Sequence, residues 1–200
     1  MNLFSLNKWT GITDSEWITY HAGNDQARLK FLLDRIEDGD RILEAGCGCG
    51  FQAGTIIKEK KPEVYAGFDP NTEKIASCTD MCFANFEHIY LTNRVFFKDT
   101  LNIALEALWY VDRYNLKTVI CTEVLEHVTD YRHAIEKLCG LVPEGGKLLV
   151  TVPAEGKLLD VPGHINDFNA GFLVEEIGKY VYIDEADEIV DTYTFIGAHK

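Results

Sequence analysis

Hydrophobic residues recur along this chain with two different spacings, which predict strands that alternate with helices. Short, largely apolar runs of strand length occupy residues 41–45, 64–68, 94–97, 117–121 and 147–152. Between them, hydrophobic positions recur at helical spacing over residues 51–60, 72–86, 101–111 and 128–140. Gly140 is the expected C-cap of the last of these helices. This alternation predicts a parallel sheet with both faces covered.

Both ends of the chain depart from this alternation. Near the start, Thr13 and Glu16 form a capping-box pattern before a hydrophobic stripe that continues at helical spacing to Ile36. Near the other end, a loop over residues 153–168 precedes a short helix for which Asn169 is the expected N-cap.

Two strand-like runs close the chain, over residues 180–183 and 189–196, and only an acidic turn separates them. So short a connection permits an antiparallel hairpin and excludes a helical crossover. We therefore expect one domain over residues 1–200, with an N-terminal cap region at 1–37 and a core at 38–200 that ends in the hairpin.

Composition narrows the choice of partners. The net charge is −13, from 32 acidic and 19 basic residues, and the basic residues do not cluster. This composition argues against binding to a nucleic-acid backbone. The sequence has no apolar run of about 20 residues and no secretory signal pattern, and its six cysteines show no CxxC pair, so we expect a cytoplasmic location without membrane insertion. The sequence does not indicate the oligomeric state.

The most informative segment joins the first strand to the helix that follows it. It reads Glu44-x-Gly46-x-Gly48-x-Gly50. Glycines let the backbone approach a ligand closely, and the following helix offers unpaired N–H groups at its start. This arrangement is typical of α/β proteins that bind an adenosine-containing cofactor. The spacing differs both from a dinucleotide fingerprint and from a phosphate-binding loop.

Acidic residues follow four successive predicted strands. They are Glu44, Asp69, Asp99 and Glu123. Open α/β sheets bind ligands at the carboxyl ends of their strands, and Asp69 lies 19 residues after Gly50, where dinucleotide-binding folds place a ribose-binding acid. Asp69 and Asp99 have an alternative role as helix N-caps.

At these positions the chain resembles a known family. The glycine turn, Gly-Phe-Asp-Pro, Lys-Asp-Thr-Leu, Glu-Val-Leu-Glu-His-Val and Pro-Glu-Gly-Gly-Lys-Leu-Leu-Val occur in the order found in class I S-adenosylmethionine-dependent methyltransferases. The resemblance covers roughly residues 29–200 and is greatest to ubiquinone-biosynthesis O-methyltransferases and bacterial sugar or natural-product methyltransferases. It implies a Rossmann-like α/β fold with a seven-stranded, mostly parallel sheet whose last strand is antiparallel.

The resemblance also implies roles in binding S-adenosylmethionine. Glu44 would orient the amino group of the cofactor, Asp69 its ribose hydroxyls, Asp99 its adenine amino group, and Glu123 would lie near the methionine portion. Glu44 replaces the more common Asp, and Cys49 the more common Thr or Ser. The full expected set is Glu44, Gly46, Cys47, Gly48, Gly50, Asp69, Pro70, Asp99, Thr100 and Glu123.

Transfer to a hydroxyl requires a group that removes or stabilises the hydroxyl proton. His127 and His164 are the candidate catalytic residues, although each has an alternative structural role, at a helix start or within a loop. Tyr20, His21 and Phe168 are the candidate substrate contacts, because relatives build the acceptor site from the N-terminal helix and the loop before the hairpin.

Part of this set also suits a divalent metal ion. Glu123, Glu126 and His127 are spaced so that their side chains can converge, and His164 would add a second imidazole. Similar segments bind a metal in ubiquinone-pathway O-methyltransferases and in small-RNA 2′-O-methyltransferases. The same segment also occurs in family members without a metal, where it contacts the cofactor and caps a helix.

The sequence therefore predicts a methyltransferase that uses S-adenosylmethionine to methylate a small molecule, most readily at a hydroxyl oxygen. Two alternatives remain open. One is a metal-dependent RNA 2′-O-methyltransferase, and the other is a non-catalytic module that binds S-adenosylmethionine. The identity of the acceptor is not readable from the sequence.

Overall fold

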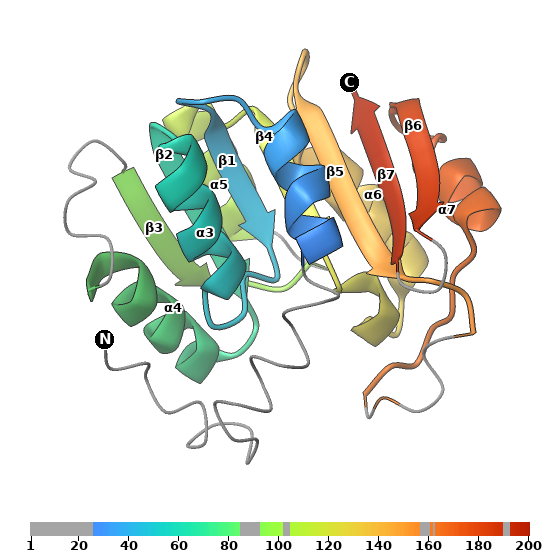
Figure 1. Cartoon of the computed structure of the whole chain (residues 1–200), viewed down its shortest axis with the longest axis horizontal. Helices are drawn as coiled ribbons and strands as arrows, with labels where there is room; N and C mark the ends of the chain where they lie inside the picture. The colour runs from blue at the N-terminus through green and yellow to red at the C-terminus, as the bar shows by residue number, and fades with distance from the viewer. Residues whose placement is uncertain (1–25, 85–92, 102–104, 157–160, 162, 190–192) are drawn as a thin grey trace.

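The structure of the chain, a computed structural model, contains a seven-stranded sheet with helices on both faces (Figure 1). It describes residues 26–84, 93–101, 105–156, 161, 163–189 and 193–200. The strands are β1 (Arg41–Ala45), β2 (Val64–Asp69), β3 (Asn93–Lys98), β4 (Thr118–Thr122), β5 (Lys147–Pro153), β6 (Tyr182–Ile189) and β7 (Tyr193–His199). Their spatial order is β3-β2-β1-β4-β5-β7-β6.

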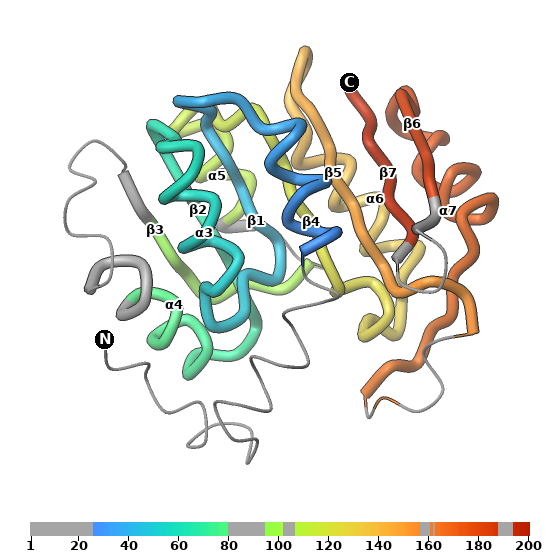
Figure 2. The backbone as a smooth tube through the Cα atoms, viewed as in Figure 1, coloured from blue at the N-terminus to red at the C-terminus, as the bar shows by residue number. Residues whose placement is uncertain are grey.

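Strand direction brings the ends of the central strands together. Strands β1 to β5 are parallel, whereas β7 lies between β5 and β6 and is antiparallel to both. Ala45 at the end of β1 pairs with Phe68 on one side and Cys121 on the other, so the carboxyl ends of β1, β2 and β4 meet at one edge. This edge lies at the bottom of Figure 2. The predicted Rossmann-like α/β fold with an antiparallel last strand is confirmed.

Helices cover both faces of the sheet. They are α3 (Phe51–Lys60), α4 (Thr72–Ala84), α5 (Leu105–Tyr114), α6 (Tyr131–Leu141), α7 (Ala170–Ile177) and the short 3-10 helix η1 (Leu125–His127). Residues 26–35 are also helical. In Figure 1, α3 and residues 26–35 lie in front of the sheet, and α5 and α6 lie behind it.

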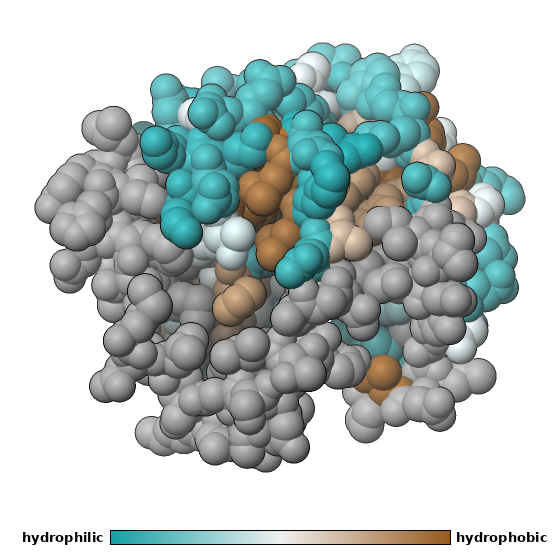
Figure 3. All heavy atoms as spheres, viewed as in Figure 1, coloured by the Kyte–Doolittle hydropathy of each residue, from teal (hydrophilic) through white to brown (hydrophobic). Residues whose placement is uncertain are grey.

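Alternate strand residues pack into two separate cores. Ile42 belongs to the cluster that includes Ile56 of α3, whereas its neighbour Leu43 belongs to the cluster that includes Leu138 of α6. Burial on both faces is what nearly continuous hydrophobic strands predict. Figure 3 shows a strip of hydrophobic residues between the hydrophilic outer surfaces of α3 and residues 26–35.

The predicted end of α6 is wrong. Gly140 lies within the helix, which continues through Leu141, and Val142 is the C-cap with an extended backbone. Pro143 explains this boundary, because the ring of a proline disfavours the helical conformation of the residue before it. The proline, and not the glycine, therefore ends the helix.

The predicted acidic turn of the hairpin is also wrong. Residues 184–188 lie within β6, which pairs with β7 alone and so forms an edge of the sheet. The side chains of Asp184, Glu185 and Asp187 are exposed on this edge strand, and charged edges oppose pairing with other chains. One of these acids, Glu185, is bonded by the guanidinium of Arg35.

The start of the predicted N-terminal helix, with Thr13 and Glu16, lies outside the described residues. In the part of the chain that is described, no helix combines the length and apolar character needed to span a bilayer. Among the described residues, Cys49, Cys121 and Cys139 carry free thiols.

The N-cap of α7 provides a test of the fold. Asn169 caps this helix as predicted, because its side-chain oxygen accepts a hydrogen bond of 2.8 Å from the N–H of Phe172. We expect Asn169→Ala to lower the free energy of unfolding by about 1 kcal/mol in urea titrations. Asn169→Asp keeps an acceptor oxygen and is the control, so equal losses in both variants would contradict the capping role.

Candidate active site

The glycine turn between β1 and α3 has a left-handed backbone that glycine adopts without strain. Gly46, Gly48 and Gly50 have φ angles of 77°, 52° and 84°. The N–H groups of Gly46 and Cys47 both donate to the carbonyl oxygen of Phe68, at 2.8 and 3.0 Å. These two hydrogen bonds attach the turn to the end of β2.

The turn is packed tightly at both ends and is open in the middle. A Cβ atom at Gly46 would lie 2.3 Å from Cγ2 of Val124, and one at Gly50 would lie 2.6 Å from the sulfur of Cys78. A Cβ atom at Gly48 would meet no atom of a described residue within 4 Å. The open position is the part of the turn that a ligand can approach.

Asp69 at the end of β2 is aimed at this open position. Its side chain is only 5% exposed, and its Oδ2 atom accepts a hydrogen bond of 3.2 Å from the N–H of Gly48. Its Oδ1 atom accepts one of 2.8 Å from the N–H of Asn71. The N–H groups of Glu73 and Lys74 at the start of α4 donate to the side chain of Asn71. Asn71 therefore fills the capping role that the sequence left open for Asp69.

Asp99 after β3 does support a helix start. Its Oδ1 atom accepts a hydrogen bond of 2.7 Å from the N–H of Thr100, and its Oδ2 atom accepts one of 3.1 Å from the N–H of Ala107 in α5. Both Asp99 and Thr100 are half-buried. Asp99 therefore has the helix-capping role that was its alternative. Its carboxylate still has lone pairs that can accept from a further donor.

Glu44 is the centre of a buried polar network beneath the turn. Its side chain is 1% exposed, and it accepts hydrogen bonds from the Tyr65 hydroxyl at 2.8 Å and from Nε2 of Gln52 at 2.7 Å. The same Gln52 nitrogen donates to the hydroxyl of Thr122 at 3.0 Å. Burial raises the pKa of Glu44 to about 7, although both hydrogen bonds act to lower it.

Glu123 follows β4 in a conformation that non-glycine residues rarely adopt. Its φ angle is 55°, and its Oε1 atom accepts a hydrogen bond of 2.9 Å from the hydroxyl of Thr151 on β5. Non-glycine residues with a left-handed backbone often cluster at functional sites. The next residue, Val124, is the one that contacts Gly46.

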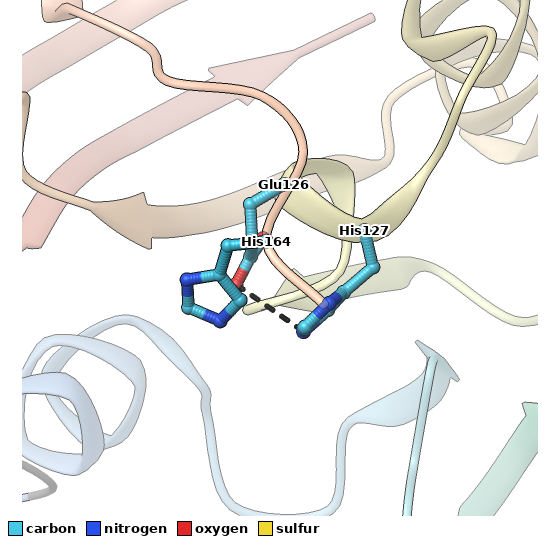
Figure 4. Close-up of side chains that lie close together, drawn as sticks. All are labelled: Glu126, His127 and His164. Atoms are coloured by element: carbon cyan, nitrogen blue, oxygen red, sulfur yellow. Dashed lines mark ion pairs between the residues drawn. The ribbon is translucent and has the colours of Figure 1, made fainter. Parts of the chain in front are cut away.

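Three other members of the predicted metal-binding set converge near the end of β4. Each of Glu126, His127 and His164 offers one ligand atom within 4.8 Å of the others. Figure 4 shows the carboxylate of Glu126 between the two imidazole rings, with Oε1 4.0 Å from Nε2 of His127. Glu123 does not belong to this three-residue cluster.

The polar atoms of the cluster are short of partners. Glu126 is fully buried, and neither of its carboxylate oxygens accepts a hydrogen bond from any other described residue. Burial, and next the charge of Glu123, raise the pKa of Glu126 well above its usual range. The Nδ1 atom of His164 is likewise buried without a partner, and burial followed by the proximity of His127 lowers the pKa of His164.

The tautomer of neutral His127 is fixed by the loop that carries His164. The Nδ1 atom of His127 lies 2.9 Å from the carbonyl oxygen of Gly163. Because a carbonyl oxygen only accepts, Nδ1 carries the proton. The lone pair of a neutral His127 is therefore on Nε2, which faces Glu126.

Sequence reasoning missed the residue that fastens this loop to η1. The side-chain amide of Asn166 donates to the carbonyl oxygens of Leu125 and Val128, at 3.0 and 2.7 Å. The N–H groups of Ile165 and Asn166 both donate to the carbonyl oxygen of Glu126. The sequence carries no signal for these contacts, because the acceptors are backbone atoms distant along the chain.

Of the three predicted substrate contacts, only Phe168 lies among the described residues, since Tyr20 and His21 fall outside them. Phe168 is 2% exposed, and its ring packs against Tyr131 and Phe172. These three rings also line an open cavity of about 340 Å³. A role for Phe168 in substrate binding stays a prediction.

Comparison with known proteins decides the family. A sequence profile of the methyltransferase-domain family matches residues 20–185. The chain belongs to the class I S-adenosylmethionine-dependent methyltransferases. A ubiquinone biosynthesis O-methyltransferase of Xanthomonas euvesicatoria pv. vesicatoria (strain 85-10) is 27% identical over 146 residues, which are 72% of this chain. The match spans 56% of the length of that relative.

Solved structures of methyltransferases share the fold. The complex between the Haloferax volcanii Trm112 methyltransferase activator and a methyltransferase contains a chain that superposes with a TM-score of 0.71 at 13% identity, over 93% of this chain and 94% of that one. Magnesium protoporphyrin IX methyltransferase from Synechocystis, with S-adenosylhomocysteine bound, gives 0.66 at 15% identity, over 94% and 87%. At these identities the likeness shows the fold alone.

Membership of this family makes S-adenosylmethionine the cofactor. The residues expected to bind it gather at one edge of the sheet, on the glycine turn and after the ends of β2, β3 and β4. Among them, the carboxyls of Asp69 and Asp99 retain lone pairs beyond the hydrogen bonds described above, whereas Glu44 is enclosed in its buried network.

The difference in packing between Gly46 and Gly48 yields a stability test. We expect Gly48→Ala to lower the free energy of unfolding by about 1–2 kcal/mol, the cost of a left-handed alanine. Gly46→Ala should cost about 1–3 kcal/mol more, because its methyl group meets Val124. Urea titration measures both variants. Equal losses would show that the turn does not press on Val124.

Proposed function

We propose that this methyltransferase acts on a hydroxyl group of a small molecule and that Glu126, His127 and His164 receive the proton of that hydroxyl. The observation that supports this proposal is the buried carboxylate of Glu126, which has no hydrogen-bond partner among the described residues and lies beside two imidazoles. Burying a polar group without a partner is costly, so such a group at a ligand-binding edge is expected to serve a ligand.

In the same proposal, the cofactor lies along the carboxyl ends of the strands. Asp69 accepts from the ribose hydroxyls next to the open position at Gly48, and Asp99 accepts from the adenine amino group. Glu123 lies near the methionine portion. Each of these carboxylates already accepts hydrogen bonds that hold it in place, which lowers the cost of orienting it when the cofactor binds.

The transfer step requires that the acceptor oxygen is aligned with the methyl group and that one proton is removed. A lone pair of the acceptor oxygen forms the new bond to the methyl carbon, and the electrons of the carbon–sulfur bond stay on the sulfur. The sulfonium becomes a neutral thioether, and the proton of the hydroxyl passes to the cluster. His127 suits this role, because its lone pair on Nε2 faces the cluster when its Nδ1 donates to Gly163.

The cluster also fits a divalent cation. Glu126 would offer an unpaired carboxylate oxygen, and the two histidines would offer imidazole nitrogens, which together form a mixed donor set that such ions accept. When bound, the ion would lower the pKa of an acceptor hydroxyl. The hydrogen bond from His127 to Gly163 is the outer contact that orients a metal-binding imidazole.

A small acceptor is favoured over RNA. The chain carries a net charge of −13, which opposes the binding of a phosphate backbone. The curated relative is named for methyl transfer to oxygen in ubiquinone biosynthesis, which supports a hydroxyl acceptor.

The cofactor site is tested by calorimetric titration with S-adenosylhomocysteine. We expect Asp69→Ala to weaken binding by about 1–3 kcal/mol, because the ribose hydroxyls lose their acceptor. Asp184→Ala removes a half-exposed acid on β6, far from the strand ends, and should leave the affinity unchanged. Equal affinities in wild type and Asp69→Ala would remove the proposed ribose contact.

The proton-accepting cluster is tested by methyl transfer to a panel of catechols, phenols and sugars. We expect His127→Ala and Glu126→Gln to slow transfer by about 10²–10⁴-fold while S-adenosylhomocysteine binds normally. His133→Ala is the matched control, because His133 lies on the outer surface of α6 beside Glu136. Unchanged rates in the two cluster variants would contradict the proposal.

Chelation separates the two forms of the mechanism. If a divalent ion occupies the cluster, EDTA should abolish transfer by wild type, and added Mg²⁺ or Mn²⁺ should restore it. If the histidine acts directly, EDTA should leave the rate unchanged.

A further inference from the structure

The carboxyl of Glu44 is buried beneath the glycine turn with neutral hydrogen-bond donors. Tyr65 reaches it from β2 and Gln52 reaches it from α3, at 2.8 and 2.7 Å. The residue is 1% exposed, so water does not stabilise its charge. A carboxyl in such surroundings is driven toward its neutral form.

The charged groups around Glu44 have opposing effects on its pKa. Arg28, in the helical residues 26–35, favours the charged carboxylate, whereas Asp69 on β2 opposes it. Cys121 on β4 adds no charge, because burial raises the pKa of its thiol well above its usual range. With burial as the largest influence, the pKa of Glu44 is about 7.

The Gln52 amide can pair with either form of the Glu44 carboxyl. In the present arrangement the Gln52 amide nitrogen donates to Glu44 and to Thr122, and the Thr122 hydroxyl lies 3.2 Å from the Gln52 oxygen. A half-turn of this amide would place its oxygen against Glu44, where it would accept the proton of a neutral carboxyl. The Thr122 hydroxyl can donate or accept, so it suits both orientations.

We propose that Glu44 holds a proton in the free protein and releases it when positively charged S-adenosylmethionine binds over the adjacent glycine turn. Methyl transfer turns the sulfonium into a neutral thioether, which removes the charge that favours the ionised carboxyl. Glu44 therefore discriminates between the cofactor and its product. This inference rests on the cofactor position given above.

The test is calorimetry at pH 7 in phosphate and in Tris, whose ionisation enthalpies differ. The change in binding enthalpy between the two buffers gives the protons released per ligand bound. We expect S-adenosylmethionine to release about half a proton in wild type, more than S-adenosylhomocysteine does, and close to none at about pH 8.5, where Glu44 is already ionised.

Glu44→Gln keeps the shape of the side chain and should abolish the difference between the two ligands. The matched control is Glu59→Gln at the exposed end of α3, which should behave as wild type. Tyr65→Phe removes a donor that favours the charged carboxylate, so it should move the proton release to higher pH. This shift keeps the inference testable if Glu44→Gln does not fold.

Three results would overturn this inference. Saturable binding of both ligands with equal proton release would remove it and leave the cofactor site intact, as would unaltered release in Tyr65→Phe and in a folded Glu44→Gln. Binding of neither ligand by folded wild type would remove both the inference and the proposed cofactor position.

Discussion

The close packing of the glycine turn between the ends of β2 and β4 is the constraint on which the rest of the site depends. Gly46 lies against Val124 with no room for a Cβ atom, and two N–H groups of the turn are bonded to Phe68. Only glycine allows this approach with a left-handed backbone. The N–H of Gly48 in this turn orients the side chain of Asp69. Val124 is the residue that directly precedes η1.

The acids near this edge fall into two physical classes. Asp69, Asp99 and Glu123 are held in place by hydrogen bonds from backbone N–H groups or from a hydroxyl. Glu44 and Glu126 are completely enclosed, and burial raises the pKa of each. The first class suits stable contacts with a ligand. Burial shifts the second class toward the neutral, protonated form.

Sequence periodicity and glycine spacing were sufficient to predict the sheet, its antiparallel last strand and the edge where the acids gather. The errors have local causes. Pro143, and not Gly140, ends α6. The acidic residues that were assigned to a turn lie in the edge strand β6. The spacing of Glu126 and His127 predicted that they would converge. The same spacing predicted that Glu123 would join them, but the left-handed backbone at Glu123 directs its side chain to Thr151. The contacts of Gln52 and Asn166 depend on tertiary packing, for which one sequence has no periodic signal.

The most direct test of the account is a crystal structure of the protein with S-adenosylhomocysteine bound. The account predicts that the ribose hydroxyls lie within hydrogen-bond distance of the Asp69 carboxylate, over Gly48. It also predicts that the sulfur faces the side of the cleft formed by Glu126, His127 and His164. A ligand bound elsewhere, or one that leaves Asp69 without contact, would contradict the arrangement of this active site.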